Sequence, residues 1–107
     1  MDTFTVRDLR ERTGELIRDA EAGELAVVTK HGRPVFVALP FDETLLKSGV
    51  VLSLAIKLYR DGVLSLERAA KLAGENVASF MEALAREGIP VADYPAQELD
   101  DETAVFD

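Results

Sequence analysis

The chain has 107 residues, 48% hydrophobic and 30% charged, which is enough for one or two small modules but too little for a large enzyme domain. It contains no cysteine and one histidine, which excludes a disulfide framework and leaves a transition metal almost no ligands. The net charge of −8 argues against non-specific coating of nucleic acid, although a local basic patch is still compatible with it.

The acidic charge is concentrated in the second half of the chain. Residues 1–47 carry seven Lys or Arg and nine Asp or Glu, whereas residues 48–107 carry five and eleven. No uncharged stretch reaches the roughly 18–20 residues that a membrane span needs. The N-terminus has no basic segment followed by an apolar run, so we expect no signal peptide and a cytoplasmic location.

The first predicted elements are a short strand over residues 3–6 and a helix over residues 6–22. Thr5 can cap the helix with Asp8 as its capping-box partner, and Gly23 can end it. Helical spacing places one set of residues on a common face: Leu9, Thr13, Leu16, Ile17 and Ala20. Arg7 and Arg10 near the helix start are either solvated or able to reach a phosphate.

A β-hairpin is predicted over residues 25–39, LAVVTKHGRPVFVAL. Two β-branched, apolar runs flank a basic turn in which Gly32 supplies the positive φ that a tight hairpin needs. Pro34 cannot donate a ladder hydrogen bond, so it fits the start of an edge strand. The tip carries Lys30, His31 and Arg33, which form either a solvated turn or a contact for an anion.

The middle of the chain is predicted to be helical. Asp42 can cap a helix that runs to residue 46 or 47, and Gly49 is a break or a bend. A second helix follows up to residues 61–62, with its apolar face formed by Val50, Val51, Leu54, Ala55, Leu58 and Tyr59.

Two shorter helices, 66–73 and 77–87, have the outline of a helix-turn-helix. Ser65 can cap the first helix, and Gly74 lies in the turn between them. Glu75 and Glu82 lie where the second helix would face phosphates, which is unfavourable for reading DNA. A structural helical pair or a protein-docking surface is the alternative.

The end of the chain, residues 88–107, carries six acidic residues and no Lys or Arg. Its apolar residues are spaced along the segment: Ile89, Val91, Tyr94, Leu99, Val105 and Phe106. We expect these anchors, with Asp100 and Asp101, to order on a protein partner. The alternative is a solvated acidic tail.

The sequence offers no catalytic machinery. It lacks a glycine-rich phosphate loop, a His/Cys cluster and a nucleophile elbow. The carboxylates at 100–102 lie in the acidic end rather than in a rigid cleft, where a catalytic pair would have to be held. We therefore expect no enzyme, no cofactor and no metal.

The first half resembles the Phd/YefM antitoxin family. The resemblance runs from Thr5 to about Leu46 and rests on the pattern T-V-R-D-L-R-x-x-T-G-E-L-I-R-x-A-E-A-G-E-x-x-V-V-T-K-H-G-R-P-V. It implies a homodimer or higher oligomer that binds operator DNA through this domain. Arg10 matches the family's helix arginine, and Lys30 and Arg33 match its basic hairpin tip. Arg7 and His31 lie beside these residues in the sequence, and the resemblance gives less support for assigning DNA contacts to them.

The second half, about residues 54–101, is similar to a small family of uncharacterised prokaryotic proteins. The matching stretches are L-A-I-K-L-Y-R-D-G-V-L-S-L-E-R-A-A-K-L-A-G and F-M-E-A-L-A-R-E-G-I-P-V. Proteins of that type are suspected antitoxins that pair with PIN-domain ribonuclease toxins. The implied function is a type II antitoxin that neutralises a toxin and represses its own operon. An orphan DNA-binding regulator or an interaction adaptor is the alternative.

These predictions define an α+β chain in three parts. Residues 1–47 are a Phd/YefM-like dimerisation and DNA-binding domain, with Arg7, Arg10, Lys30, His31 and Arg33 as its contacts. Residues 48–88 are a helical, helix-turn-helix-like module. Residues 89–107 are an acidic, extended toxin-binding tail.

Overall fold

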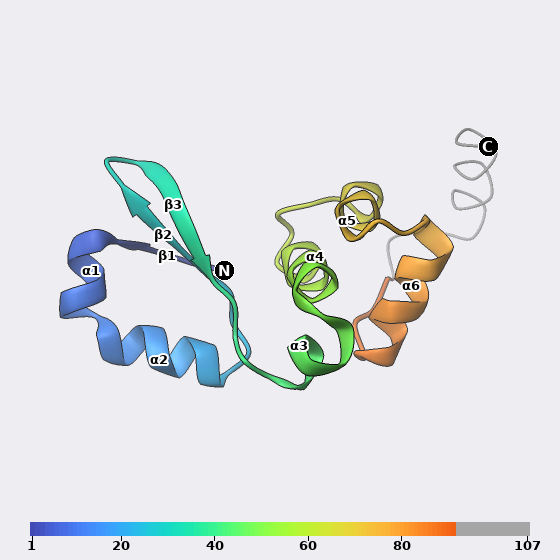
Figure 1. Cartoon of the computed structure of the whole chain (residues 1–107), viewed down its shortest axis with the longest axis horizontal. Helices are drawn as coiled ribbons and strands as arrows, with labels where there is room; N and C mark the ends of the chain where they lie inside the picture. Colours follow the sequence, from blue (N-terminus) through green and yellow to red (C-terminus); the bar gives the residue numbers. More distant parts are fainter. Residues whose placement is uncertain (92–107) are drawn as a thin grey trace.

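The structure, a computed structural model, describes residues 1–91, and its fold is α+β as predicted (Figure 1). Within these residues the elements are β1 (Asp2–Thr5), α1 (Val6–Glu11), α2 (Thr13–Glu21), β2 (Ala26–Lys30), β3 (Arg33–Ala38), α3 (Glu43–Ser48), α4 (Val50–Arg60), α5 (Leu66–Ala73) and α6 (Val77–Arg86). The sheet with α1 and α2 forms one half of the molecule, and α3 to α6 form the other.

The sheet has the order β1-β2-β3, so the central strand is β2 and β3 lies at an edge. β1 runs parallel to β2, with Thr5 opposite Thr29, and β2 pairs antiparallel with β3. The register shifts between Val28, which faces Phe36, and Thr29, which faces Pro34, so Val35 is an extra residue on β3. Pro34 therefore lies on an edge strand beside a bulge, where its missing N–H costs least.

Two hydrophobic clusters form the core of residues 1–91. Phe4 of β1 and Ala26 and Val28 of β2 are buried on one face of the sheet, with Leu9 and Leu16 packed against them. The larger cluster lies among α4, α5 and α6, where Tyr59 meets Phe80 edge-to-face with ring centroids 6.3 Å apart. This division places a sheet-based core in the first half and a helical core in the second.

The predicted helix over residues 6–22 is two helices, α1 and α2, which meet at Arg12. Thr13 donates from its hydroxyl to the Leu9 carbonyl, and Thr13 and Gly14 are both poor helix formers. The bend changes the predicted apolar face: Leu9 and Leu16 contact the sheet cluster, whereas Ile17 is 53% exposed. The prediction of a single helix was wrong because it applied one continuous helical period to residues on both sides of this bend.

The predicted caps are present. Thr5 and Asp8 form a reciprocal capping box, Asp42 accepts from the Leu45 amide at 3.0 Å, and Ser65 accepts from the Arg68 amide. Gly74 ends α5 in the left-handed conformation, with φ +73°. Helices α5 and α6 thus flank a glycine turn as the sequence predicts.

The predicted apolar face of α4 is partly wrong. Val50 and Val51 are exposed, whereas Ser53, Ile56 and Lys57 are buried together with Ala55. The face is rotated because α4 packs against α5 on one side and contacts the α2–β2 loop on another. Lys57 on the second side is buried by contacts with residues far away in the sequence, which helical spacing alone cannot predict.

The ionised carboxylate of Asp19 on α2 destabilises the folded protein at neutral pH. Interaction with the carboxyl of Asp2, followed by burial and the charge of Glu15, raises the pKa of Asp19 above its ordinary value. A carboxyl with a raised folded-state pKa adds stability only while it is protonated, and that stability is lost as the pH rises through the folded pKa.

We therefore expect Asp19→Asn to raise the unfolding midpoint at pH 7, with a gain that shrinks at acid pH. Thermal unfolding of both proteins at a series of pH values measures this. Asp8→Asn is the matched control with the opposite sign, because the hydrogen bond from the Thr5 backbone N–H lowers the pKa of Asp8. A pH-independent effect of Asp19→Asn would contradict this electrostatic interpretation.

Candidate nucleic-acid interface

The tip of the β2–β3 hairpin exposes three of the predicted DNA-binding residues. Lys30 and Arg33 are the last paired residues of the two strands. His31 and Gly32 form the turn between them with φ values of 52° and 77°, the positive φ at both central residues that a tight hairpin turn prefers. Because the turn is short, Lys30, His31 and Arg33 stay close together and exposed at one end of the sheet.

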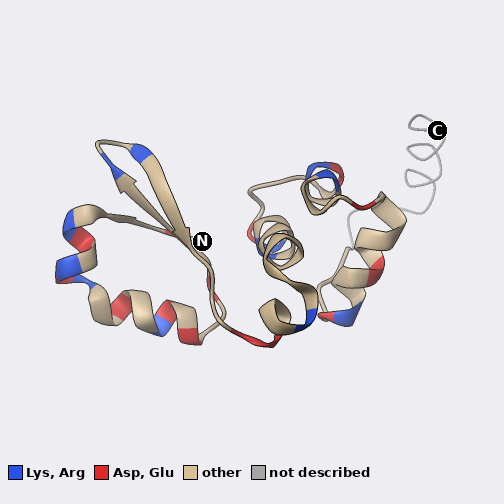
Figure 2. Cartoon of the chain, in the orientation of Figure 1, with Lys and Arg blue, Asp and Glu red and all other residues tan. Residues whose placement is uncertain are grey.

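The other two predicted residues, Arg7 and Arg10, are exposed on α1. Because β1 is parallel to β2 and Thr5 lies opposite Thr29, α1 begins at the end of the sheet where β2 reaches the hairpin turn. Figure 2 shows these cations on α1 and near the hairpin tip, away from helices α4 to α6. We call the five residues Arg7, Arg10, Lys30, His31 and Arg33 the basic end.

The cations of the basic end are available to an external anion. Among residues 1–91 no ion pair joins the side chain of Arg7, Arg10, Lys30 or Arg33 to a carboxylate. Helix α1, which carries Arg7 and Arg10, also exposes the carboxylate of Glu11. The arrangement suits contacts to several phosphates, which position a protein on DNA, more than it suits a buried ligand.

Arg12 is a structural residue of this region that the sequence analysis did not single out. Its guanidinium lies 2.7 Å from Glu15, 3.3 Å from Asp8 and 4.5 Å from the centre of the Phe4 ring. The hydrogen bond to Glu15 raises the pKa of Arg12 further. These contacts fix the bend between α1 and α2, and so the direction in which α1 presents Arg7 and Arg10. Acidic residues four before and three after Arg12 were the available sign of this role.

The predicted toxin-binding residues fall into two groups. Ile89 and Val91 are partly buried and pack against the helical core cluster. The remaining ones lie outside the described residues: Tyr94, Leu99, Asp100, Asp101, Val105 and Phe106. The part of the predicted tail that the structure describes therefore belongs to the packing of the helical half.

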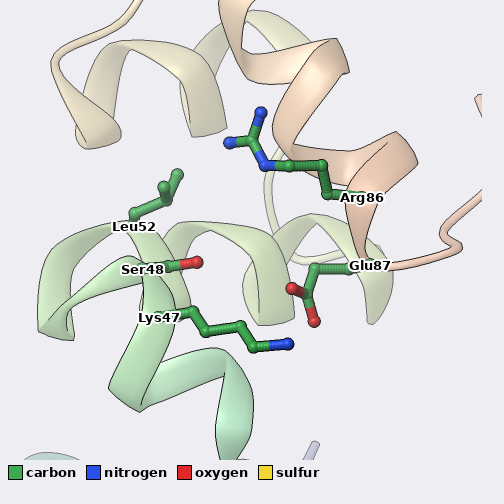
Figure 3. A pocket seen from close by; sticks show the side chains of 5 residues that line it. All are labelled: Lys47, Ser48, Leu52, Arg86 and Glu87. Carbon is green, nitrogen blue, oxygen red and sulfur yellow. The ribbon is translucent and has the colours of Figure 1, made fainter.

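A hollow of about 420 Å³ opens between the α3–α4 junction and the C-terminal end of α6. It is lined by Lys47, Ser48, Leu52, Arg86 and Glu87, whose side chains face one another in Figure 3. The Glu87 carboxylate accepts a hydrogen bond from the Thr44 hydroxyl at 2.6 Å. The hollow contains none of the predicted DNA-binding residues, so it is separate from the basic end.

The described residues contain neither a cluster of metal-binding side chains nor a helix that could span a membrane. Among residues 1–91, no group of three or more His, Cys, Asp or Glu side chains is arranged to hold a metal ion. In the same part of the chain no helix is long and apolar enough to cross a membrane.

Comparison with known proteins assigns the two halves. Residues 1–44, which contain the whole basic end, match the Phd/YefM antitoxin family of type II toxin–antitoxin systems. Residues 33–107 match UPF0175, an uncharacterised protein family. The chain belongs to UPF0175, and its N-terminal residues 1–44 are similar to the Phd/YefM antitoxins. Both resemblances seen in the sequence are thereby confirmed.

Relatives agree with this assignment. A UPF0175 protein of Aeropyrum pernix is 44% identical over 54 residues, which are 50% of this chain and 60% of the relative. Antitoxin VapB46 of Mycobacterium tuberculosis, in two strains, is 43% identical over an alignment of 56 positions that covers 48% of this chain and 55% of the relative. The chain thus spans little more than half the length of these relatives.

Proposed function

We propose that this protein is the antitoxin of a type II toxin–antitoxin system that also represses its own operon. The observation that carries the proposal is the basic end: exposed cations that form no ion pair within residues 1–91, in an acidic chain and within the residues that match an antitoxin family. The relatives named antitoxin VapB46 support the same class. The protein would be a regulator rather than an enzyme, acting in the cytoplasm, where its DNA and toxin are.

Operator binding would use the basic end of two copies. β3 is an edge strand whose Val35, Phe36 and Val37 are all exposed, and such an edge is a ready surface for a second chain. A homodimer that covers this edge would bring two basic ends to one DNA duplex. Phosphate contacts from Lys30 and Arg33 would then be doubled, which raises affinity and its dependence on salt.

Toxin binding would use the C-terminal part of the chain. Residues 92–107 contain six Asp or Glu and no Lys or Arg, together with Tyr94, Leu99 and Phe106 as apolar anchors. Such a segment suits the basic cleft of a ribonuclease, and a PIN-domain ribonuclease is the partner that we propose. The division of labour would follow three regions: 1–47 for dimerisation and DNA, 48–88 for the helical module, and the acidic end for the toxin.

Removing residues 92–107 should abolish toxin capture and leave DNA binding intact. The shortened chain keeps Ile89 and Val91, which pack on the helical core, so we expect it to fold. The test is co-expression with the product of the neighbouring gene, affinity capture, mass measurement of the complex, and gel-shift titration of the promoter fragment.

A full-length variant with Tyr94, Leu99 and Phe106 replaced by alanine is the matched control for the loss of chain length and charge. We expect it to lose most toxin binding, because aromatic and aliphatic anchors dominate such interfaces. Continued rescue of growth by the shortened chain during toxin expression would refute the toxin-binding assignment. Intact DNA binding without any captured toxin would instead favour an orphan regulator.

A further inference from the structure

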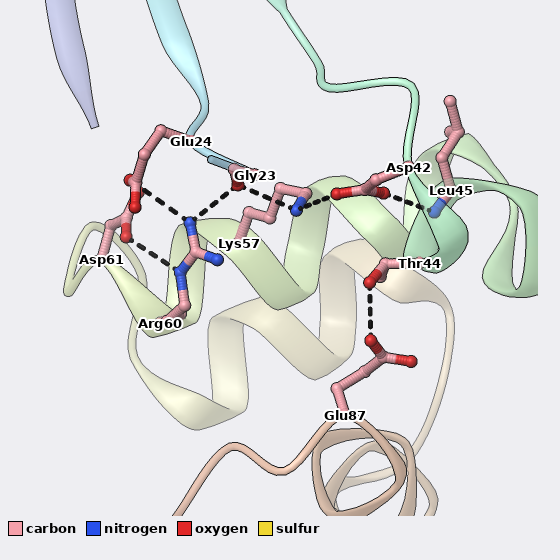
Figure 4. A network of polar contacts seen from close by, with 9 residues as sticks. All are labelled: Gly23, Glu24, Asp42, Thr44, Leu45, Lys57, Arg60, Asp61 and Glu87. Carbon is pink, nitrogen blue, oxygen red and sulfur yellow. Dashed lines mark hydrogen bonds and ion pairs between the residues drawn. The ribbon is translucent and has the colours of Figure 1, made fainter. Parts of the chain in front are cut away.

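The buried ammonium group of Lys57 joins the two halves of the molecule. Lys57 lies on α4, and only 4% of its side chain is exposed. Its Nζ donates to the Gly23 carbonyl at 3.0 Å and to Asp42 Oδ2 at 2.9 Å (Figure 4). A buried cation needs partners to replace its lost hydration, and these two contacts supply them.

The two partners of Lys57 lie at the two open ends of the hairpin. Gly23 precedes β2, and Asp42 follows β3, so one ammonium group contacts both the entering and the leaving segment. The turn at residues 31–32 lies at the opposite end of the strands. At about 3.3 Å per residue, the five residues of β2 alone span roughly 17 Å between the tip and the end of the strand that is nearer to this contact.

Neighbouring contacts fix the same region. Arg60, one turn further along α4, donates to the Gly23 carbonyl at 3.2 Å and to Glu24 at 3.4 Å. Asp42 also caps α3 through its other oxygen. Burial alone would raise the pKa of Asp42, but hydrogen bonds from the Leu45 amide and the Lys57 ammonium outweigh burial and lower it. The carboxylate therefore stays ionised opposite the ammonium at neutral pH.

We infer that Lys57 is a positioning residue for DNA binding: by holding Gly23 and Asp42 together, it sets the direction of the hairpin whose tip carries Lys30 and Arg33. The DNA part of this inference rests on the proposed function. Lys57 lies in the UPF0175 region and the hairpin tip in the Phd/YefM region. The helical half thus orients the DNA contacts of the first half.

The test uses the full chain with both charges removed together, Asp42→Asn and Lys57→Met. Asparagine keeps an oxygen that can cap α3, and methionine keeps the length of the buried stem. Replacing a buried ion pair by uncharged groups is often neutral for stability, so this double variant separates positioning from unfolding. Lys71→Met, on an exposed position of α5, is the control for loss of a lysine.

We expect amide hydrogen exchange in β2 and β3 to become at least about tenfold faster in the double variant, with little change in its unfolding midpoint. Affinity for the promoter fragment should fall about tenfold. The slope of log K against log salt should become shallower by at least about 0.9, which is the contribution of one phosphate contact. A merely structural role would leave that slope unchanged at temperatures where both proteins are folded. Lys71→Met should match the wild type in all three measurements.

Unchanged exchange in β2 and β3 would overturn the inference that Lys57 fixes the hairpin. Faster exchange with unchanged affinity and salt slope would overturn its role in DNA binding. If the double variant does not fold, Lys57→Met alone carries the same measurements, because the remaining Asp42 carboxylate is 29% exposed and keeps the α3 cap, so no buried charge is left unpaired. If the wild-type protein binds no promoter DNA, the proposed function fails, while the exchange data still decide whether Lys57 fixes the hairpin.

Discussion

Replacing Lys30 and Arg33 together by glutamine should weaken binding to the promoter fragment about 30-fold or more. The two side chains flank the hairpin turn, are exposed, and make no ion pair within residues 1–91, so we expect their replacement to leave the fold unchanged. An arginine that contacts DNA contributes about 1–3 kcal/mol, and 2 kcal/mol corresponds to about 30-fold. In a dimer four cations are removed, so the salt slope should decrease by about 3.6.

Gel-shift or anisotropy titrations at several salt concentrations measure both quantities. The matched control is Arg68→Gln with Lys71→Gln, which removes one exposed arginine and one exposed lysine of α5, in the other half of the molecule. We expect this control to keep nearly all of the affinity. Equal losses in the two variants would mean that net charge, rather than the basic end, governs binding.

Replacing Phe4 by alanine should destabilise the protein by about 3–5 kcal/mol, a large share of the total for a small domain. Phe4 is fully buried in a cluster that contains only two other fully packed residues, Ala26 and Val28. Its ring also lies against Arg12, which fixes the bend between α1 and α2. Loss of the ring therefore removes both the core of the sheet and the support of α1.

Urea denaturation monitored by circular dichroism gives this free energy of unfolding. Phe41→Ala is the control because it makes the same substitution at a position where the ring is 82% exposed in the monomer. We expect it to change the free energy of unfolding of dilute protein by less than about 0.5 kcal/mol. A similar loss in both variants would show that Phe41 is covered in solution.

The hairpin and the helix caps could be predicted from sequence because their signals are local. Gly32 in the turn, the Thr5–Asp8 capping box and Asp42 before α3 each act within three residues. The basic end could also be proposed, since its cations cluster in the sequence near the turn and near the start of α1. The parallel pairing of β1 with β2, which brings those two groups to one end, is a long-range contact.

The parts that the sequence did not predict depend on contacts between distant residues. The bend at Arg12 is stabilised by the Phe4 ring in another element. Lys57 appears in an apolar helix as an ordinary surface lysine, yet its partners are 34 and 15 positions away. Helical periodicity describes one packing partner, so it placed Val50 and Val51 inside and overlooked the second buried side of α4.

The exposed edge strand has a consequence for how the protein responds to its own abundance. Among residues 1–91 nothing covers Val35, Phe36 and Val37, so a molecule that packs on β3 would remove their side chains from water. Any partner that binds the folded edge and not the unfolded chain adds stability that grows with the partner's concentration. If that partner is a second copy, dilution would act on this protein as a mild denaturant does, and a falling copy number would favour its unfolding.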